Sequence, residues 1–275
     1  MAPGLSKRAM QWRRRTHGRR WRWAGGVVLA LVAVVAVGWW TNGARGAPPN
    51  YRPRTEALRR APLRFYRASP ARAFVWFLGN DIGVWGAQQR LASALAERGF
   101  DVVGVDVRAW FAARPSEPAE VRAAAFRAAT QQLMREAQRE LGDTLLPVVL
   151  AGHSVGAEVA LWIAANTAPP RLTGVVAIAP GTRGHLRVTA SDLAFGEPTE
   201  LGSFAVDSLL RQLAPSVRVA LVRGANDRLR SADSALVAAR PAMRHIVVPF
   251  AAHSMQRLFI AGPMIERAVA WAAGW

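Results

Sequence analysis

The sequence predicts a three-layer α/β domain, in which helices cover both faces of a mostly parallel sheet. From about residue 63, short apolar runs alternate with longer stretches that have helical spacing. Apolar runs without polar alternation are typical of strands buried on both faces, and helices between such strands connect them in parallel. The 275 residues suffice for one domain of this kind with a sizeable core, preceded by an N-terminal appendage.

The expected strands follow one another at intervals that leave room for a helix between most of them. They are 73–79, 101–107, 145–152, 174–180, 217–224 and 245–250. The expected helices are 84–100, 118–142, 157–166 and a final one over 255–274. Segment 181–200, after the fourth strand, has no regular pattern, so we expect it to be irregular.

The positive charge of the chain lies almost wholly in its N-terminal part. The net charge is +18, yet residues 1–72 hold 16 Lys and Arg with one acid, whereas the remainder holds 20 Arg and 17 acids. Nucleic-acid binding needs basic residues gathered on a folded face, which this distribution does not favour. The sequence has no cysteine, which excludes disulfides, thiol nucleophiles and thiolate metal sites. We expect no nucleic-acid partner, no metal and no organic cofactor.

An uncharged stretch over residues 23–40 follows a basic arm over residues 1–22. As a helix, its 18 residues span about 27 Å, close to the hydrocarbon thickness of a bilayer. Tryptophans stand at both ends, as in interfacial belts. Because the arginines precede the span, we expect a single-pass anchor in the inner (cytoplasmic) membrane, with a cytoplasmic N-terminus and a periplasmic domain over 63–275. Residues 41–62, rich in Pro and Arg, are expected to form a linker.

Three other interpretations of the N-terminal part stay open. A cleaved signal peptide would need a small-residue site, which Ala44-Arg45-Gly46 could supply. The arginine pairs could belong to a twin-arginine signal, and the apolar stretch could be a buried helix of a soluble protein. Its length and its terminal tryptophans favour the uncleaved anchor.

Residues 152–156 spell Gly-His-Ser-Val-Gly, a G-x-S-x-G motif between an expected strand and an expected helix. A nucleophile elbow needs a strand before the serine, a helix after it and small residues beside it, because the turn is too tight for larger side chains. A structural serine on a strand–turn–helix unit would give the same pattern. The context predicts that Ser154 is a nucleophile.

The serine hydroxyl is a weak nucleophile until a base takes its proton and an acid orients that base. Asp227 directly follows the fifth expected strand, and His253 directly follows the sixth. The order Ser, acid, His along the chain matches a triad on the late strands of one sheet. Asp106, at the end of the second strand, is an alternative acid that would orient His253; otherwise it binds loop N–H groups near the site.

The oxyanion of acyl transfer needs backbone donors. The candidates are the N–H of Val155 and that of Asn80 or Asp81, in the loop after the first core strand. His153 is expected to point away from the serine hydroxyl and to pack or support the site. His185, in the irregular segment, is expected either to contact substrate or to lie at the surface.

Over about residues 62–275 the chain resembles the α/β-hydrolase superfamily, and more narrowly the VirJ/AcvB group of bacterial virulence-associated proteins. The segments that carry the narrower resemblance are "GNDIGVW" (79–85), "VVGVDVRAWFAARPSEP" (102–118), "GHSVGAEV" (152–159) and "GHLRVTASDLAFG" (184–196). This chain departs from the group in three ways. Its 79–85 loop lacks a double Gly, His153 replaces an aromatic residue, and Glu158 replaces an Asp.

The resemblance implies an exported protein, and the group includes hydrolases of aminoacylated phosphatidylglycerol, an ester at the membrane surface. Residues and resemblance together predict a membrane-anchored serine hydrolase that cleaves an ester with Ser154, His253 and Asp227. The alternative is a non-catalytic binding or scaffold protein on the same fold, with envelope or secretion proteins as partners.

Overall fold

The computed structural model describes residues 26, 28–34, 46–113, 117–189, 192, 196–255 and 258–275. The chain divides into two compact units, residues 1–44 and 45–275. In the first unit residues 28–34 are helical. The predicted basic arm (1–22) and much of the predicted span (23–40) lie outside the described residues. Within the described part, no helix has both the length and the apolar character needed to cross a bilayer.

A mostly parallel sheet forms the centre of residues 45–275, as predicted. Its seven described strands run in the order β1-β3-β2-β4-β5-β8-β9. Only β1 is antiparallel to its neighbour β3, and the other paired strands are parallel. The strands are β1 Leu63–Tyr66, β2 Ala73–Leu78, β3 Phe100–Val105, β4 Val148–His153, β5 Leu172–Ile178, β8 Arg218–Gly224 and β9 Arg244–Val248.

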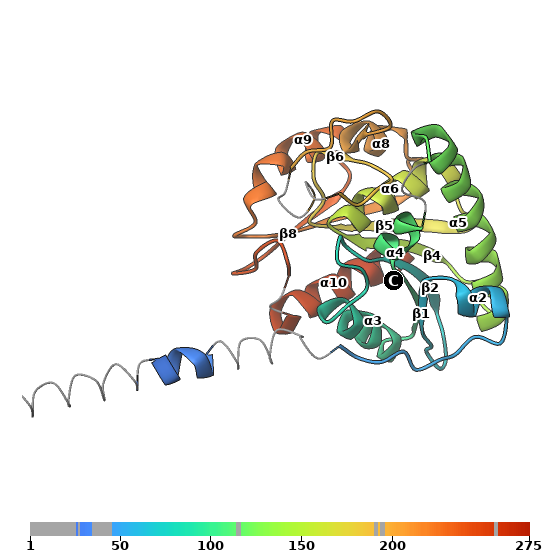
Figure 1. The fold of residues 1–275 in the computed structure, drawn as a ribbon, viewed down its shortest axis with the longest axis horizontal. Helices are drawn as coiled ribbons and strands as arrows, with labels where there is room; N and C mark the ends of the chain where they lie inside the picture. Colours follow the sequence, from blue (N-terminus) through green and yellow to red (C-terminus); the bar gives the residue numbers. More distant parts are fainter. Residues whose placement is uncertain are drawn as a thin grey trace, which may run out of the picture. The chain divides into compact units, whose positions relative to one another are not determined.

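Helices cover both faces of this sheet, which makes three layers (Figure 1). One face is covered by α3 (Ala87–Glu97) and α10 (Leu258–Ala273), and the other by α4 (Val107–Ala112), α5 (Ala119–Leu141), α6 (Val155–Thr167), α8 (Val206–Gln212) and α9 (Asp233–Ala239). Strand β2 shows why the apolar runs lack polar alternation. Trp76 packs into the core on the α5–α6 side, whereas Val75 and Phe77 pack into the core on the α3–α10 side.

The expected strand and helix boundaries differ from the observed ones by up to three residues, with identifiable causes. Strand β4 begins at Val148, not at residue 145, because Pro147 has no N–H for the ladder. Helix α5 ends at Leu141 because Gly142 takes a left-handed conformation (φ 88°) that caps it.

The chain before residue 63 differs from the expected linker. It contains a short helix, α2 (Glu56–Arg60), and Leu58 of this helix is buried in the core. Tyr51 pairs with Phe65 of β1, and its hydroxyl donates to Glu140 of α5 (2.8 Å). From residue 46 onward the predicted linker 41–62 is therefore part of the domain, because its few apolar side chains are buried against it.

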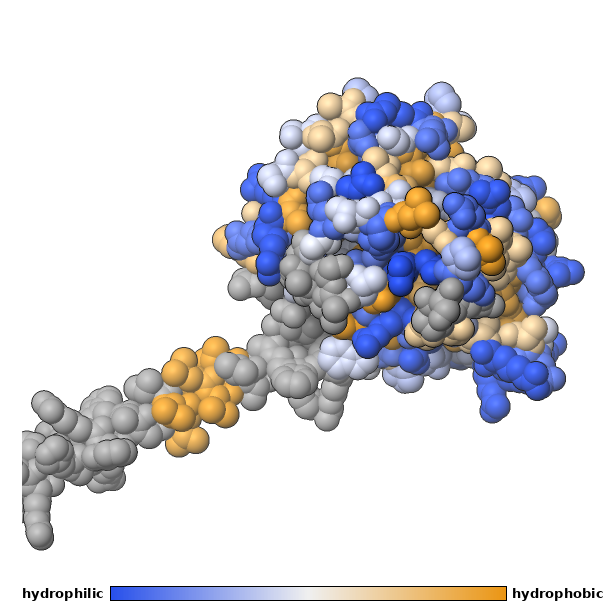
Figure 2. Space-filling model, turned by 45° about the horizontal axis from the view of Figure 1, so that its top comes forward, coloured by the Kyte–Doolittle hydropathy of each residue, from blue (hydrophilic) through white to orange (hydrophobic). Residues whose placement is uncertain are grey.

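Among its described residues, the segment 181–200 contains a short strand, β6 (Arg183–Gly184), which pairs with β7 (Phe204–Ala205) just beyond it. This two-stranded piece lies outside the central sheet. On the face of the domain in Figure 2, hydrophilic and hydrophobic residues are interspersed.

Candidate active site

Ser154 occupies a strained turn between β4 and α6. Its backbone has φ 55° and ψ −125°, a conformation that a residue with a side chain adopts only when its surroundings impose it. The two glycines of the motif explain how the turn fits. A Cβ on Gly152 would overlap the carbonyl oxygen of Gly156, and a Cβ on Gly156 would overlap the carbonyl oxygens of Leu78 and Gly79. The turn has the geometry of a nucleophile elbow.

His253 lies against the serine, as the candidate base should. It follows β9, in the connection to α10, and its Nε2 is 2.9 Å from the Ser154 Oγ. At this distance the imidazole can accept the hydroxyl proton.

Asp227 contacts the other nitrogen of the same imidazole. Its Oδ1 and Oδ2 lie 3.2 and 3.1 Å from His253 Nδ1. Burial alone would raise the pKa of Asp227, but hydrogen bonds from His253, the Leu229 N–H and Arg223 outweigh it and lower this pKa to about 2. The carboxylate is therefore ionised at neutral pH and favours the His253 tautomer with its proton on Nδ1, leaving Nε2 free to accept from Ser154.

Asp227 is held by groups that the sequence prediction missed. Arg223 of β8, with no exposed surface, donates to Asp227 (2.9 Å), to Asp233 (2.8 Å) and to the Pro180 carbonyl oxygen (2.7 Å). An arginine inside an apolar strand, four residues before an aspartate, is the sequence signal that could have revealed this ion pair, because an unpaired charge is rarely buried.

The predicted oxyanion donors lie on two segments in contact through Gly156. Val155 is the first residue of α6, directly after Ser154. In the 79–85 loop the Gly79 N–H donates to the Val105 carbonyl oxygen (2.9 Å), so it is not available for substrate. The N–H groups of Asn80 and Asp81 remain the candidates in this loop. Burial raises the pKa of the Asp81 carboxyl, and the nearby carboxylate of Asp192 raises it further.

Asp106, the alternative candidate for the acid that orients His253, contacts other groups. It caps α4 by accepting the Ala109 N–H (2.9 Å). Its carboxylate also packs against Gly83 so closely that a Cβ there would clash with it. Asp106 thus caps a helix and packs against the 79–85 loop, and the acid that contacts His253 is Asp227.

The other two predicted histidines are both buried and lie in different surroundings. His153 is next to the triad, and its Nε2 lies 2.8 Å from the His253 carbonyl oxygen. His185 contacts Asp192 (3.0 Å) and Glu200. Burial alone would lower the pKa of His185, but these two carboxylates raise it. His185 therefore links parts of the 181–200 segment and does not lie at the surface, whereas its contact with substrate stays a prediction.

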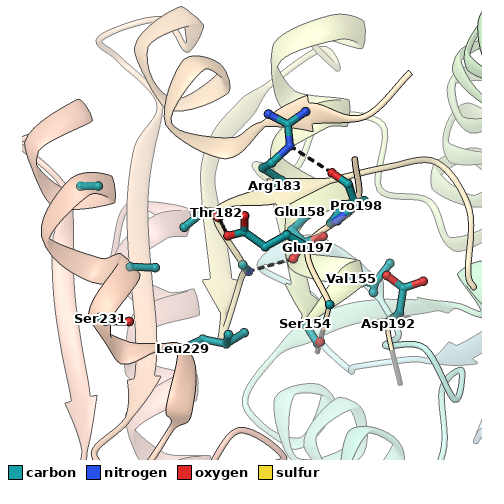
Figure 3. Close-up of a pocket in the computed structure, with 14 residues that line it drawn as sticks. Ser154, Val155, Glu158, Thr182, Arg183, Asp192, Glu197, Pro198, Leu229 and Ser231 are labelled. Atoms are coloured by element: carbon teal, nitrogen blue, oxygen red, sulfur yellow. Dashed lines mark hydrogen bonds between the residues drawn. The ribbon is translucent and has the colours of Figure 1, made fainter. Parts of the chain in front are cut away.

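A pocket of about 370 Å³ opens beside Ser154 (Figure 3). Three carboxyl side chains line it, those of Glu158, Asp192 and Glu197. Burial raises the pKa of Glu158 to about 8, although it accepts the Gly181 N–H (2.8 Å). Arg183 also lines the pocket, but its guanidinium points away from Ser154, toward the Pro198 carbonyl oxygen and Ser203. The described residues contain no group of three or more side chains suited to a metal ion.

A serine on this turn, contacted by a base and an acid from the ends of later strands, defines a class of enzymes, the serine hydrolases of the α/β-hydrolase fold. Within that class the chain belongs to the family described as serine aminopeptidase, S33, whose model matches residues 70–269. The narrower VirJ/AcvB resemblance stays a prediction.

Solved structures support the fold. The esterase domain of a Rhodothermus marinus protein is 19% identical with a TM-score of 0.55, over 77% of this chain and 91% of that one. Est1E from Butyrivibrio proteoclasticus is 10% identical with a TM-score of 0.56, over 78% and 94%. The thioesterase domain from the curacin biosynthetic pathway is 16% identical with a TM-score of 0.51, over 76% and 94%. A comparison with curated protein sequences finds no match.

Proposed function

We propose that this protein is a membrane-anchored serine hydrolase that cleaves an ester bearing a cationic amine, such as an aminoacyl-phosphatidylglycerol. The observation that carries hydrolysis is the continuous contact from Ser154 through His253 to Asp227. Separate observations support cleavage of an ester bond, recognition of a substrate amine and attachment to the membrane.

Ser154 Oγ attacks the ester carbonyl carbon while His253 Nε2 takes its proton. The tetrahedral oxyanion accepts hydrogen bonds from the Val155 N–H and from that of Asn80 or Asp81. His253 then passes the proton to the leaving alcohol, and an acyl enzyme remains on Ser154. Water, deprotonated by His253, releases the acid and restores the serine. Asp227 stabilises the imidazolium in both steps because its carboxylate stays ionised.

The descriptions of similar proteins favour an ester as the substrate. An esterase domain and a thioesterase domain have this fold. The family description, serine aminopeptidase, points to substrates with a free amino group. An aminoacyl ester combines an ester carbonyl with such an amine.

The acidic lining of the pocket favours a cationic group near the scissile carbonyl. Glu158, Asp192 and Glu197 line the pocket that opens at Ser154. The guanidinium of Arg183, which lines the same pocket, is turned toward the Pro198 carbonyl oxygen and away from Ser154, so it does not stand between the serine and these carboxyl groups (Figure 3). A substrate ammonium beside Glu158 would favour the ionised carboxylate and release its proton, which couples binding to pH.

Membrane attachment is supported by the described helical residues of the first unit. Val28, Leu29, Leu31, Val32 and Val34 are 58–71% exposed. Figure 2 draws the described residues of this unit as an orange, hydrophobic cluster. Exposed apolar side chains within a longer uncharged stretch are typical of a segment that contacts lipid. The proposed location is the inner membrane, with the catalytic domain on the periplasmic side.

A substrate panel on the detergent-purified full chain tests this function. The panel compares lysyl-phosphatidylglycerol in mixed micelles, its N-acetylated counterpart and a neutral fatty-acid ester. We expect hydrolysis of the first with a kcat/KM at least about tenfold above the second, since loss of one charge-assisted contact costs about 1.5–3 kcal/mol. Equal rates on the free and acetylated amines would contradict amine recognition, and no hydrolysis of any ester would contradict the function.

The acidic lining is tested separately with the variant Glu197→Gln, an exposed carboxyl of the same pocket. We expect this variant to raise the KM for the lysyl ester and to leave the KM for the neutral ester unchanged.

The location of the domain is tested by adding protease to spheroplasts. Digestion of the domain supports the proposed topology, and protection in intact spheroplasts with digestion after lysis contradicts it.

A further inference from the structure

One chain of hydrogen bonds connects the three segments that carry the candidate site. The Trp85 N–H donates to Gln88 Oε1 (3.2 Å), and Gln88 Nε2 lies 3.1 Å from His153 Nδ1. His153 Nε2 in turn lies 2.8 Å from the His253 carbonyl oxygen. Trp85 ends the 79–85 loop, His153 precedes the nucleophile, and His253 is the base. The chain therefore runs from the oxyanion loop through the elbow to the base.

The donor and acceptor of each hydrogen bond in this chain follow from its last acceptor, the His253 carbonyl oxygen. A carbonyl oxygen only accepts, so His153 Nε2 carries the proton that it donates to His253. A neutral imidazole has one N–H, which leaves Nδ1 to accept from the Gln88 amide nitrogen. The Gln88 carbonyl oxygen then faces the Trp85 N–H, as observed. Each donor meets an acceptor, and one tautomer of His153 satisfies the whole chain.

The surroundings keep this arrangement intact. His153 and Gln88 are 5% and 7% exposed, so water competes little for their polar groups. Burial also lowers the pKa of His153 to about 4, which keeps its imidazole neutral at the pH at which a serine hydrolase works. A protonated ring would have two N–H donors, and its Nδ1 would then face the Gln88 amide donor.

The segment that carries His253 needs such support. The described residues of the connection from β9 to α10, 249–255, form neither helix nor strand. Phe250 and Met255 within it have φ of 58° and 49°. Backbone conformations of this kind persist only where neighbouring groups hold them. A direct hydrogen bond to the carbonyl of the base fixes the backbone at the residue whose side chain must reach Ser154.

We propose that His153 is a positioning residue that holds the His253 backbone so that its imidazole stays in reach of Ser154, and that Gln88 selects the His153 tautomer that does so. This inference rests on the proposed serine-hydrolase function. A displacement of about 1 Å in a catalytic group costs on the order of 100-fold in rate. His153 therefore acts through His253 and contacts neither substrate nor the reacting atoms.

The variants His153→Phe and His153→Gln separate the hydrogen bond from simple packing. Phe fills the site without a donor, whereas the amide nitrogen of Gln can reach the position of the imidazole Nε2. On an ester that wild type hydrolyses, we expect His153→Phe to lower kcat about 10–100-fold with KM within about twofold, and His153→Gln to recover most of the loss. Wild-type kcat in His153→Phe, or a His153→Gln variant as slow as His153→Phe, would overturn the proposal.

The variant Gln88→Met tests whether Gln88 selects the tautomer of His153. It also tests the chain of hydrogen bonds if His153→Phe does not fold. Methionine has a similar shape but cannot donate to His153. We expect a lower kcat with an unchanged KM. Gln138→Met, at a buried glutamine of α5 outside the site, is the matched control and should keep wild-type kcat. Equal kcat in the two methionine variants would overturn the role of Gln88.

Nitrogen NMR of the histidine rings shows which imidazole nitrogen carries the proton, and this measurement needs no substrate. His153 should carry its proton on Nε2 in wild type, and the share of the Nδ1 tautomer should be larger in Gln88→Met than in wild type. A wild-type ring protonated on Nδ1 would overturn the inference even if the enzyme is active. Failure of the proposed function is distinct, because wild type would then hydrolyse no ester while the NMR result still stands.

Discussion

Arg223 donates from Nη1 to Asp227 Oδ2 at 2.9 Å, and neither side chain has any exposed surface. This buried ion pair helps to keep the acid of the candidate triad ionised, together with the hydrogen bonds from His253 and Leu229. The same arginine contacts Asp233 and the carbonyl oxygen of Pro180, two residues after β5, so the acid is fixed to the sheet through β8. The geometry of the triad thus depends on a charge that contacts neither Ser154 nor the pocket.

Replacement of Arg223 by methionine should destabilise the fold. The variant leaves Asp227 and Asp233 buried without their cation, so we expect the free energy of unfolding to fall by about 3–5 kcal/mol in denaturant titrations. Arg211→Met is the matched control, because Arg211 and Asp207 form an exposed pair with the same spacing. That change should cost about 0–1 kcal/mol. Similar losses in both variants would contradict the role given to the buried pair.

The two candidate acids should respond differently to the same conservative change. Asp227→Asn removes the charge that orients His253, so kcat should fall by about 10⁴-fold. In Asp106→Asn the amide oxygen can still cap α4, so activity should stay within about tenfold of wild type. Steady-state hydrolysis of one ester by both purified variants decides between them. The reverse ranking would make Asp106 the acid.

Glu158 should make stability fall as pH rises. Its pKa is about 8 in the folded protein against an ordinary value of 4.5, so between these pH values the folded state holds a proton that the unfolded state has lost. The free energy of unfolding should then decrease by about 1 kcal/mol per pH unit from this group.

Glu158→Gln keeps an oxygen for the Gly181 N–H and has no proton to lose, so it should flatten this pH dependence in denaturant titrations. Glu97→Gln, at an exposed glutamate of α3, is the control. An unchanged slope in Glu158→Gln would show that Glu158 is ionised in the folded state.

Gly156→Ala should disturb two predicted oxyanion segments at once. The added Cβ would overlap the carbonyl oxygens of Leu78 and Gly79, so the elbow and the 79–85 loop must move apart. We expect a loss of about 1–3 kcal/mol in stability and a larger relative loss in kcat. Gly262→Ala in α10 is the control, because a Cβ there would come no closer than 4.0 Å to its nearest neighbour, Glu266 Oε1. Equal kcat in the two alanine variants would contradict the contact.

Much of the fold could be predicted because each part leaves a local pattern in the sequence. Buried parallel strands appear as short apolar runs, and the glycines around Ser154 reflect contacts within one turn. Strand β1 was missed because "LRFY" is short and carries an arginine, and α2 because its five residues have only one buried apolar side chain, Leu58.

Apart from the Arg223–Asp227 spacing, the hydrogen bonds that support the site could not be predicted, because their partners are backbone atoms, lie in an irregular segment or are far apart in the chain. His153 meets the backbone of His253 100 residues later, and a backbone acceptor leaves no mark in the sequence. His185 is paired with carboxyl groups of the segment that sequence patterns leave irregular. Gln88 looks like any polar residue of an amphipathic helix until the sheet brings its amide against His153.

Labelling with a fluorophosphonate probe tests the central claim most directly, because the probe reacts with a serine hydroxyl only when a base activates it. The purified chain is incubated with the probe, and the modified peptide is identified by mass spectrometry. The account predicts stoichiometric modification of Ser154 with loss of ester hydrolysis, and none in Ser154→Ala. Absence of label on folded wild type, or label elsewhere with hydrolysis retained, would contradict it.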